Sequence, residues 1–146
     1  MYGTASGSDD ALFEGGILVP KGGMPIEERV MGPVWSGVRA KILDVQQVLS
    51  ATDEHAACEP STIYVKCKTR DEPLAPVFAV IWMRSAREVV LGLATPEPIV
   101  HACAIAPPAK MKYKGLTTYV PITEAEPLPR ELADWSRQAF VHASAI

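Results

Sequence analysis

Val77-Phe-Ala-Val-Ile-Trp-Met83 and Glu88-Val-Val-Leu-Gly-Leu-Ala94, joined by Arg84-Ser-Ala-Arg87, decide the fold that this sequence predicts. The first run is almost wholly apolar, which is typical of a central strand covered on both faces. A four-residue connection makes a tight hairpin, so the sheet is at least partly antiparallel. Thr95-Pro-Glu-Pro98 then ends the pairing, because proline cannot donate to a strand ladder.

Two further strands flank this hairpin in the sequence. Within 61–68, three apolar positions alternate with Tyr64, Lys66 and Lys68, which predicts a half-buried strand with these three side chains on the exposed side. A last strand is expected over 116–122. The segment between the hairpin and this last strand stays open, because residues 99–105 suit either a strand or a helical turn.

Helical periodicity frames the strands on both sides. Apolar residues recur every three or four positions from about Pro33 to Ser50, which predicts an amphipathic helix. The same spacing from Leu128 to Ala143 predicts a C-terminal helix, with Pro129 near its first turn. Two helices on one face of a mostly antiparallel sheet of four to five strands make a two-layer α+β domain.

Length and composition indicate one ordinary globular domain. The chain has 146 residues, of which 48% are apolar and 21% charged, and its net charge is −3. This acidic balance argues against a nucleic-acid partner. We expect residues 1–10, which are small and polar, to be disordered, and residues 11–146 to form the domain. No leader peptide or membrane-spanning run is apparent, so we expect a cytoplasmic protein and no membrane partner.

The cysteines and histidines carry no recognisable spacing. Cys58, Cys67 and Cys103 are odd in number and include no Cys-x-x-Cys pair, which predicts no disulfide framework and a reducing compartment. Alternation places Cys67 on the side of the sheet opposite Lys66, so we do not expect a reactive thiol there. The three histidines lie far apart in the sequence, and His55 with Cys58 is the close pair of possible metal ligands. We therefore predict no metal, no cofactor and no catalytic residue.

Several segments resemble a known bacterial family. From about Leu12 to Ala143 the chain is similar to the family called domain of unknown function 5655, which lies near the YdhG-like group of small α+β proteins. The resemblance implies an α+β fold and no reaction. It is carried by Ser61-Thr-Ile-Tyr-Val-Lys66, Pro76-Val-Phe-Ala-Val-Ile-Trp82, Val89-Val-Leu-Gly-Leu93, Lys112-Tyr-Lys-Gly-Leu-Thr-Thr-Tyr119 and the final Leu-Ala-Asp-Trp135.

A set of basic and aromatic residues is the one functional signal. If the strand at 61–68 approaches the segment at 110–114, the lysine and tyrosine side chains of the two segments could share a surface that suits an anionic or planar ligand. The alternative is that lysines on an exposed sheet face keep the protein soluble and discourage edge pairing. The candidate ligand-binding residues are Tyr64, Lys66, Trp82, Lys112 and Tyr113.

Three functions remain open at this level. The first is a small ligand-binding or interaction module without catalysis, acting on an anionic or planar ligand or on a protein partner, as a monomer or homodimer. The second is an enzyme whose dispersed Lys, Tyr and Arg site acts on an anionic small molecule. The third is iron handling, by analogy with the YdhG-like group alone, although the sequence lacks the dense acidic run that hard oxygen ligation needs.

Overall fold

A computed structural model describes residues 13–14, 17–18, 36–60, 64–85 and 87–145. The segment at 1–10, for which we predicted disorder, lies outside these residues. The elements in chain order are β1 (Phe13–Glu14), β2 (Ile17–Leu18), α2 (Ser36–Ser50), β3 (Ala57–Pro60), β4 (Tyr64–Lys68), β5 (Val77–Ser85), β6 (Glu88–Leu93), β7 (Thr118–Thr123) and α3 (Leu132–Ser144).

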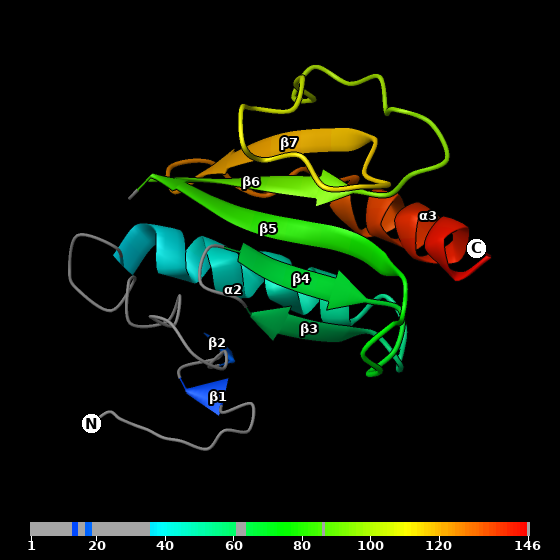
Figure 1. Cartoon of the computed structure of the whole chain (residues 1–146). Coiled ribbons are helices and arrows are strands. Elements are labelled where there is room, and N and C mark those ends of the chain that lie inside the picture. The colour runs from blue at the N-terminus through cyan, green and yellow to red at the C-terminus, as the bar shows by residue number, and fades with distance from the viewer. Residues whose placement is uncertain (1–12, 15–16, 19–35, 61–63, 86, 146) are drawn as a thin grey trace.

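The main sheet is a five-stranded antiparallel meander in the order β3-β4-β5-β6-β7 (Figure 1). The predicted hairpin is present, but its first strand runs on to Ser85, whereas the second ends at Leu93. Ser85 pairs with Glu88, so the turn holds two residues in place of the four predicted. The short strand β3, which the sequence pattern did not indicate, forms the outer edge beside β4. β1 and β2 pair with each other in a separate two-stranded sheet.

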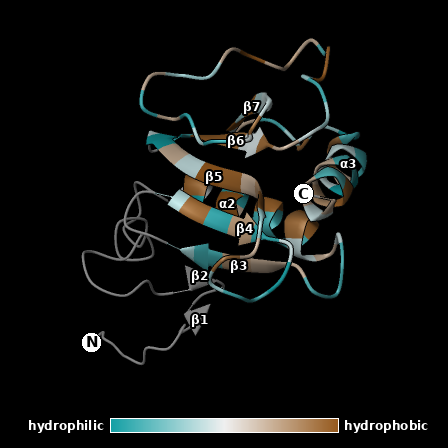
Figure 2. Ribbon diagram, turned by 45° about the vertical axis from the view of Figure 1, so that its right-hand side comes forward, coloured by the Kyte–Doolittle hydropathy of each residue, from teal (hydrophilic) through white to brown (hydrophobic). Residues whose placement is uncertain are grey.

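Both helices cover the same face of this sheet, which confirms the two-layer α+β prediction. Their apolar stripes meet the inward side chains of the strands, and Figure 2 shows the hydrophobic stretch of β5 lying next to α2. Of the apolar residues in the helix and strand patterns that we expect to face the core, Val34 and Ile63 lie outside the described residues. The others are buried: Val38, Ile42, Val45, Val65, Phe78, Val80, Leu91, Leu93, Val120, Leu132 and Trp135.

The second face of the sheet is covered by a long connection instead of a helix. β6 and β7 are neighbours in the sheet, yet residues 94–117 separate them and arch away before returning (Figure 1). We call this segment the strap. Its residues Met111, Tyr113 and Leu116 pack against a buried cluster on β5, β6 and β7. The strap explains why the central strands are apolar on both faces.

Threonine hydroxyl groups tie the two ends of the strap together. The Oγ1 atom of Thr95 lies 2.8 Å from that of Thr117 and 2.7 Å from that of Thr118. The amide of Ile99 donates to the Thr118 hydroxyl at 2.9 Å. The segment 99–105, which the sequence left open, is neither a strand nor a helix; Ile105 forms a single bridge with Tyr119. A connection longer than about 12–15 residues is uncommon and is usually functional or disordered.

A glycine lets the strap approach the sheet closely. A Cβ atom on Gly92 would lie 2.6 Å from Leu116 Cδ1 and within 3.2 Å of the rings of Trp82 and Tyr119. Residue 92 is therefore small because the strap and two aromatic rings fill the space above it. Among the described residues, no helix is both long enough and apolar enough to cross a membrane.

Candidate functional site

The strap-covered face brings together three of the five predicted ligand-binding residues. Tyr64 on β4 is the cross-strand partner of Trp82 on β5, and their ring centroids lie 6.1 Å apart in an edge-to-face arrangement. Tyr113 of the strap approaches the same tyrosine, also at 6.1 Å and edge to face. Trp82 in turn stacks on Tyr119 at 6.0 Å. We call these four side chains the aromatic face.

The exposure of these side chains decides which of them a ligand could touch. Trp82 is only 4% exposed, so it supports its neighbours and offers no open stacking platform. Tyr64 and Tyr113 are half-buried, as is Lys66, whereas Lys112 is exposed. Lys112 stands between Met111 and Tyr113, which both pack on the aromatic face. The reachable part of the surface is therefore the edges of the two tyrosine rings. Lys66 follows Tyr64 by two positions on β4, and Lys112 directly precedes Tyr113 in the strap.

The second lysine of β4, Lys68, does not reach solvent, although we predicted an exposed side chain there. The pairing of β4 with β5 shifts between Cys67 and Lys68, and Lys68 is only 4% exposed. Its ammonium group forms an ion pair with Glu59 at 2.8 Å and donates to the carbonyl oxygen of Glu72 at 2.8 Å. The hydrogen bond from Lys68 lowers the pKa of Glu59. The positive charge of Lys68 is therefore paired within the fold and is not offered to a ligand.

A second group of chemically active side chains lies where the strap meets the start of α3. The His101 Nδ1 atom is 3.0 Å from Cys103 Sγ and also accepts the backbone N–H of Cys103 at 3.2 Å. The Nε2 atom of the same ring lies 3.6 Å from the Glu131 carboxylate. A cavity of about 200 Å³ adjoins the three residues. The imidazole of His101 thus contacts a thiol through one nitrogen and approaches a carboxylate through the other.

The electrostatics of this group hold the thiol in its neutral form. Burial raises the pKa of Cys103, and the nearby negative charge of Glu131 raises it further. The sequence analysis overlooked this pair and considered His55 with Cys58 instead, whereas His55 pairs with Asp53. The available signal was the His-x-Cys spacing at 101–103, in a segment bounded by prolines. Glu131, which is distant in sequence, could not have been added without the fold.

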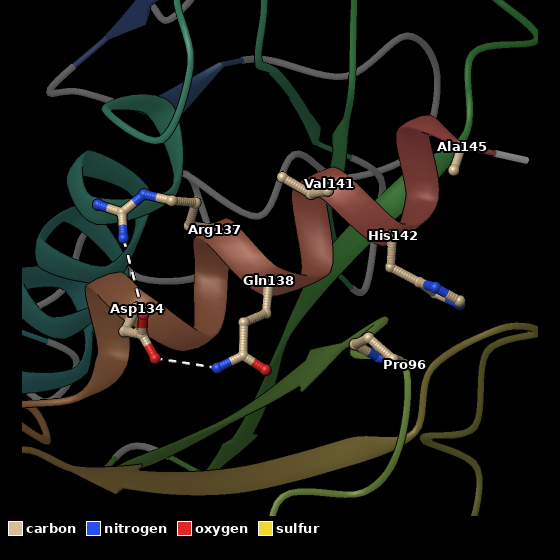
Figure 3. A pocket seen from close by; sticks show the side chains of 7 residues that line it. All are labelled: Pro96, Asp134, Arg137, Gln138, Val141, His142 and Ala145. Atoms are coloured by element: carbon tan, nitrogen blue, oxygen red, sulfur yellow. Dashed lines mark hydrogen bonds and ion pairs between the residues drawn. The ribbon is translucent and has the colours of Figure 1, made fainter.

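A groove larger than the cavity beside His101 runs along the outer side of α3. It has a volume of about 480 Å³ and is lined by helix residues together with Pro96 (Figure 3). Its polar groups bond to each other: Asp134 accepts from Gln138 at 2.9 Å and lies 3.7 Å from Arg137. Val141 is 61% exposed there. Figure 3 shows Asp134 bonded to Arg137 and Gln138 of its own helix, whereas His142 lies near the other end of α3, so we assign no chemistry to this groove.

Comparison with family models, with curated proteins and with solved structures gave no match to this chain. The resemblance to domain of unknown function 5655 therefore stays a prediction. In the part of the chain that the structure describes, no three His, Cys, Asp or Glu side chains gather closely enough to hold a metal ion. Glu124 and Glu126 are the closest that the sequence comes to an acidic run, and the Glu124 carboxylate lies 3.4 Å from the Arg87 guanidinium.

Proposed function

We propose that this chain is a small binding module without catalysis, whose aromatic face takes an anionic, planar ligand. The observation that carries the proposal is the convergence of Tyr64 and Tyr113 from two segments distant in sequence. The Tyr64 ring centroid lies 6.1 Å from that of Tyr113 and 6.1 Å from that of Trp82. Tyrosine edges accommodate a planar ring, and lysines beside them attract an anion. A cytoplasmic location and membership of the resembled family are parts of the same proposal.

The strap supports this proposal because hydrogen bonds to the sheet hold it in a fixed position. Its ends are fixed by the threonine hydroxyl groups, and the amide of Tyr113 donates to the Tyr119 hydroxyl at 3.3 Å. Tyr113 is therefore held in place before any ligand arrives, which reduces the entropy lost on binding. Lys66 and Lys112 supply charge that acts over about 8–10 Å in physiological salt.

Isothermal titration calorimetry with a panel of planar anions, from salicylate to adenosine 5′-monophosphate, tests the proposal. We expect at least one member to bind, with affinity that falls in Lys66→Gln and in Tyr113→Ala. The matched control is Arg130→Gln, which removes the same charge from an exposed position outside the strap. Binding that is lost equally in all three variants, or that is absent across the panel, contradicts the proposal.

A second function, an enzyme that uses a thiol nucleophile, is favoured by the 3.0 Å contact between His101 and Cys103. His101 Nδ1 would take the thiol proton while the sulfur attacks the carbonyl carbon of an ester or thioester. The alcohol or thiol of the substrate would leave with that proton, and water would then hydrolyse the acyl–Cys103 thioester. The raised pKa of Cys103 opposes this step, so the function ranks second. Turnover of 4-nitrophenyl acetate that disappears in both Cys103→Ser and His101→Gln would promote it. Iron handling receives no supporting observation and is not proposed.

A further inference from the structure

Cys58 and Cys67 occupy directly opposed positions on neighbouring strands. They are cross-strand partners in the β3–β4 pair, and their Sγ atoms lie 2.7 Å apart with both thiols free. This separation is shorter than an ordinary van der Waals contact between two sulfur atoms. The backbone therefore holds the two thiols close to the arrangement that a disulfide of about 2.05 Å requires.

The two thiols differ in access to solvent. Cys67 is 0% exposed and belongs to the helix-covered core, whereas Cys58 is half-buried on the edge strand β3. The hydroxyl of the exposed Ser50, at the end of α2, lies 3.7 Å from Cys58 Sγ. Cys58 is therefore the more accessible of the two cysteines, and Cys67 lies behind it in the core.

The ionisation of the pair is asymmetric in the same direction. The hydrogen bond from Cys67 lowers the pKa of Cys58, and burial raises the pKa of Cys67. Thiolate formation thus falls first on the sulfur that solvent can reach. This is the division between an attacking and a resolving thiol in exchange chemistry.

We propose that Cys58 and Cys67 form a redox-active dithiol site that takes a low-molecular-weight disulfide as its oxidant. The Cys58 thiolate attacks one sulfur of the disulfide R–S–S–R, so that a Cys58–S–S–R bond forms and RS⁻ leaves and takes up a proton. Cys67 then loses its proton and attacks Cys58 Sγ, which expels the second RS⁻. The two cysteines lose two electrons and two protons in total, and the disulfide becomes two RSH molecules.

The bond would link β3 to β4 at the edge of the sheet. It would leave the aromatic face untouched, because Cys67 points to the helix-covered side and Cys58 packs against the same core. The inference therefore stands independently of the proposed ligand. Cys103, which contacts His101 in the strap, takes no part in it.

The test equilibrates the native full-length chain in glutathione buffers of increasing oxidised fraction. Remaining thiols are then labelled with N-ethylmaleimide, and the protein is weighed by mass spectrometry. We expect free thiols to fall from three to one, because Cys58 and Cys67 are consumed, with no glutathione retained. The change should occur at a ratio of oxidised to reduced glutathione at least about tenfold lower than in urea, because folding holds the two sulfurs together.

Variants separate the two roles. Cys67→Ala should trap one glutathione on Cys58, since no resolving thiol remains, whereas Cys58→Ala should leave Cys67 unreacted. Cys103→Ser is the control and should still form the bond. Peptide mapping of the wild-type chain locates the linkage without any variant, so a misfolded mutant does not spoil the test. The proposal would be overturned if Cys58 and Cys67 both stayed reduced at every ratio of oxidised to reduced glutathione, or if the disulfide involved Cys103. Equal oxidation of the folded and the urea-unfolded chain would also overturn it.

Discussion

The two faces of the five-stranded sheet are covered in different ways. On one face, α2 and α3 seal a core of aliphatic side chains, such as Ile81 and Leu91, together with a few aromatic rings. On the other face, the strap lies over an aromatic cluster and is fixed by hydroxyl groups and a single close glycine contact. The first cover excludes water along its length, whereas the second leaves tyrosine edges and lysines reachable. We therefore assign stability mainly to the helix face and recognition to the strap face.

The largest effect should come from the helix face. Phe78 is 0% exposed and meets Phe140 of α3 edge to face at 5.2 Å. Phe78→Ala should lower the free energy of unfolding by about 3–5 kcal/mol, because it opens a cavity between the central strand and the helix. Chemical denaturation measures this loss, with Leu74→Ala as the control, since Leu74 is 96% exposed. Equal stability of the two variants would remove Phe78 from the core.

Crowding beneath the strap should cost less. Gly92→Ala forces Leu116 and two rings to shift, so we expect a loss of about 1–3 kcal/mol in unfolding free energy. The same variant should weaken binding of a planar anion. Gly115→Ala is the comparison, because its φ of 93° strains an alanine while its Cβ meets nothing within 4 Å. It should cost about 1 kcal/mol through backbone strain. A harmless Gly92→Ala would mean that the strap does not lie against β6.

The coupling between Tyr64 and Tyr113 should be smaller still. A double-mutant cycle with both tyrosines changed to alanine should give a coupling energy of about 0.5–1.5 kcal/mol, as an edge-to-face pair does. The control cycle pairs Tyr64 with Phe140, which packs on the helix face and should show no coupling. A similar value in both cycles would point to a general loss of stability and not to contact between the strap and β4.

The smallest effect concerns the ion pair beneath the second face. Lys68 lowers the pKa of Glu59 in the folded chain, so the pair adds stability above the ordinary glutamate pKa of about 4.3 and loses it as pH falls through the lowered value. Glu59 is 53% exposed, so solvent limits the contribution to under about 1 kcal/mol. Glu59→Gln should differ from wild type at pH 7 and match it more closely near pH 3. Glu97→Gln, which makes the same substitution at an exposed position, is the matched control.

The helix face was predictable because its signals are periodic and local. Val38, Ile42 and Val45 repeat at helical spacing, and the apolar run of β5 required cover on both sides. The nature of the second cover was not predictable. Residues 94–117 show no period, and what holds them is a set of hydroxyl contacts, such as Thr95 with Thr118, between positions far apart in the sequence. β3 was missed because four residues carry too little pattern.

The candidate sites divide in the same way. Alternation along β4 placed Tyr64 on the face opposite Cys67, and the aromatic neighbours followed from the strand pairing. Alternation also placed Lys68 on the face of Lys66, but it did not predict that an ion pair with Glu59 of β3 would take the side chain out of solvent. The facing of Cys58 and Cys67 depends on the unpredicted edge strand. The approach of Glu131 to His101 depends on where α3 begins, and no local spacing records this.

The most direct test of the division between the two faces is a ¹H–¹⁵N NMR titration of the labelled chain with the planar anion that binds best. The account predicts shifts at Tyr64, Lys66, Lys112 and Tyr113, and little change along α2 or at the outer groove of α3. Adenosine, which is planar but uncharged, should shift the same amides less than adenosine 5′-monophosphate does. Shifts confined to α3 or to the His101–Cys103 pair would contradict the assignment of recognition to the aromatic face.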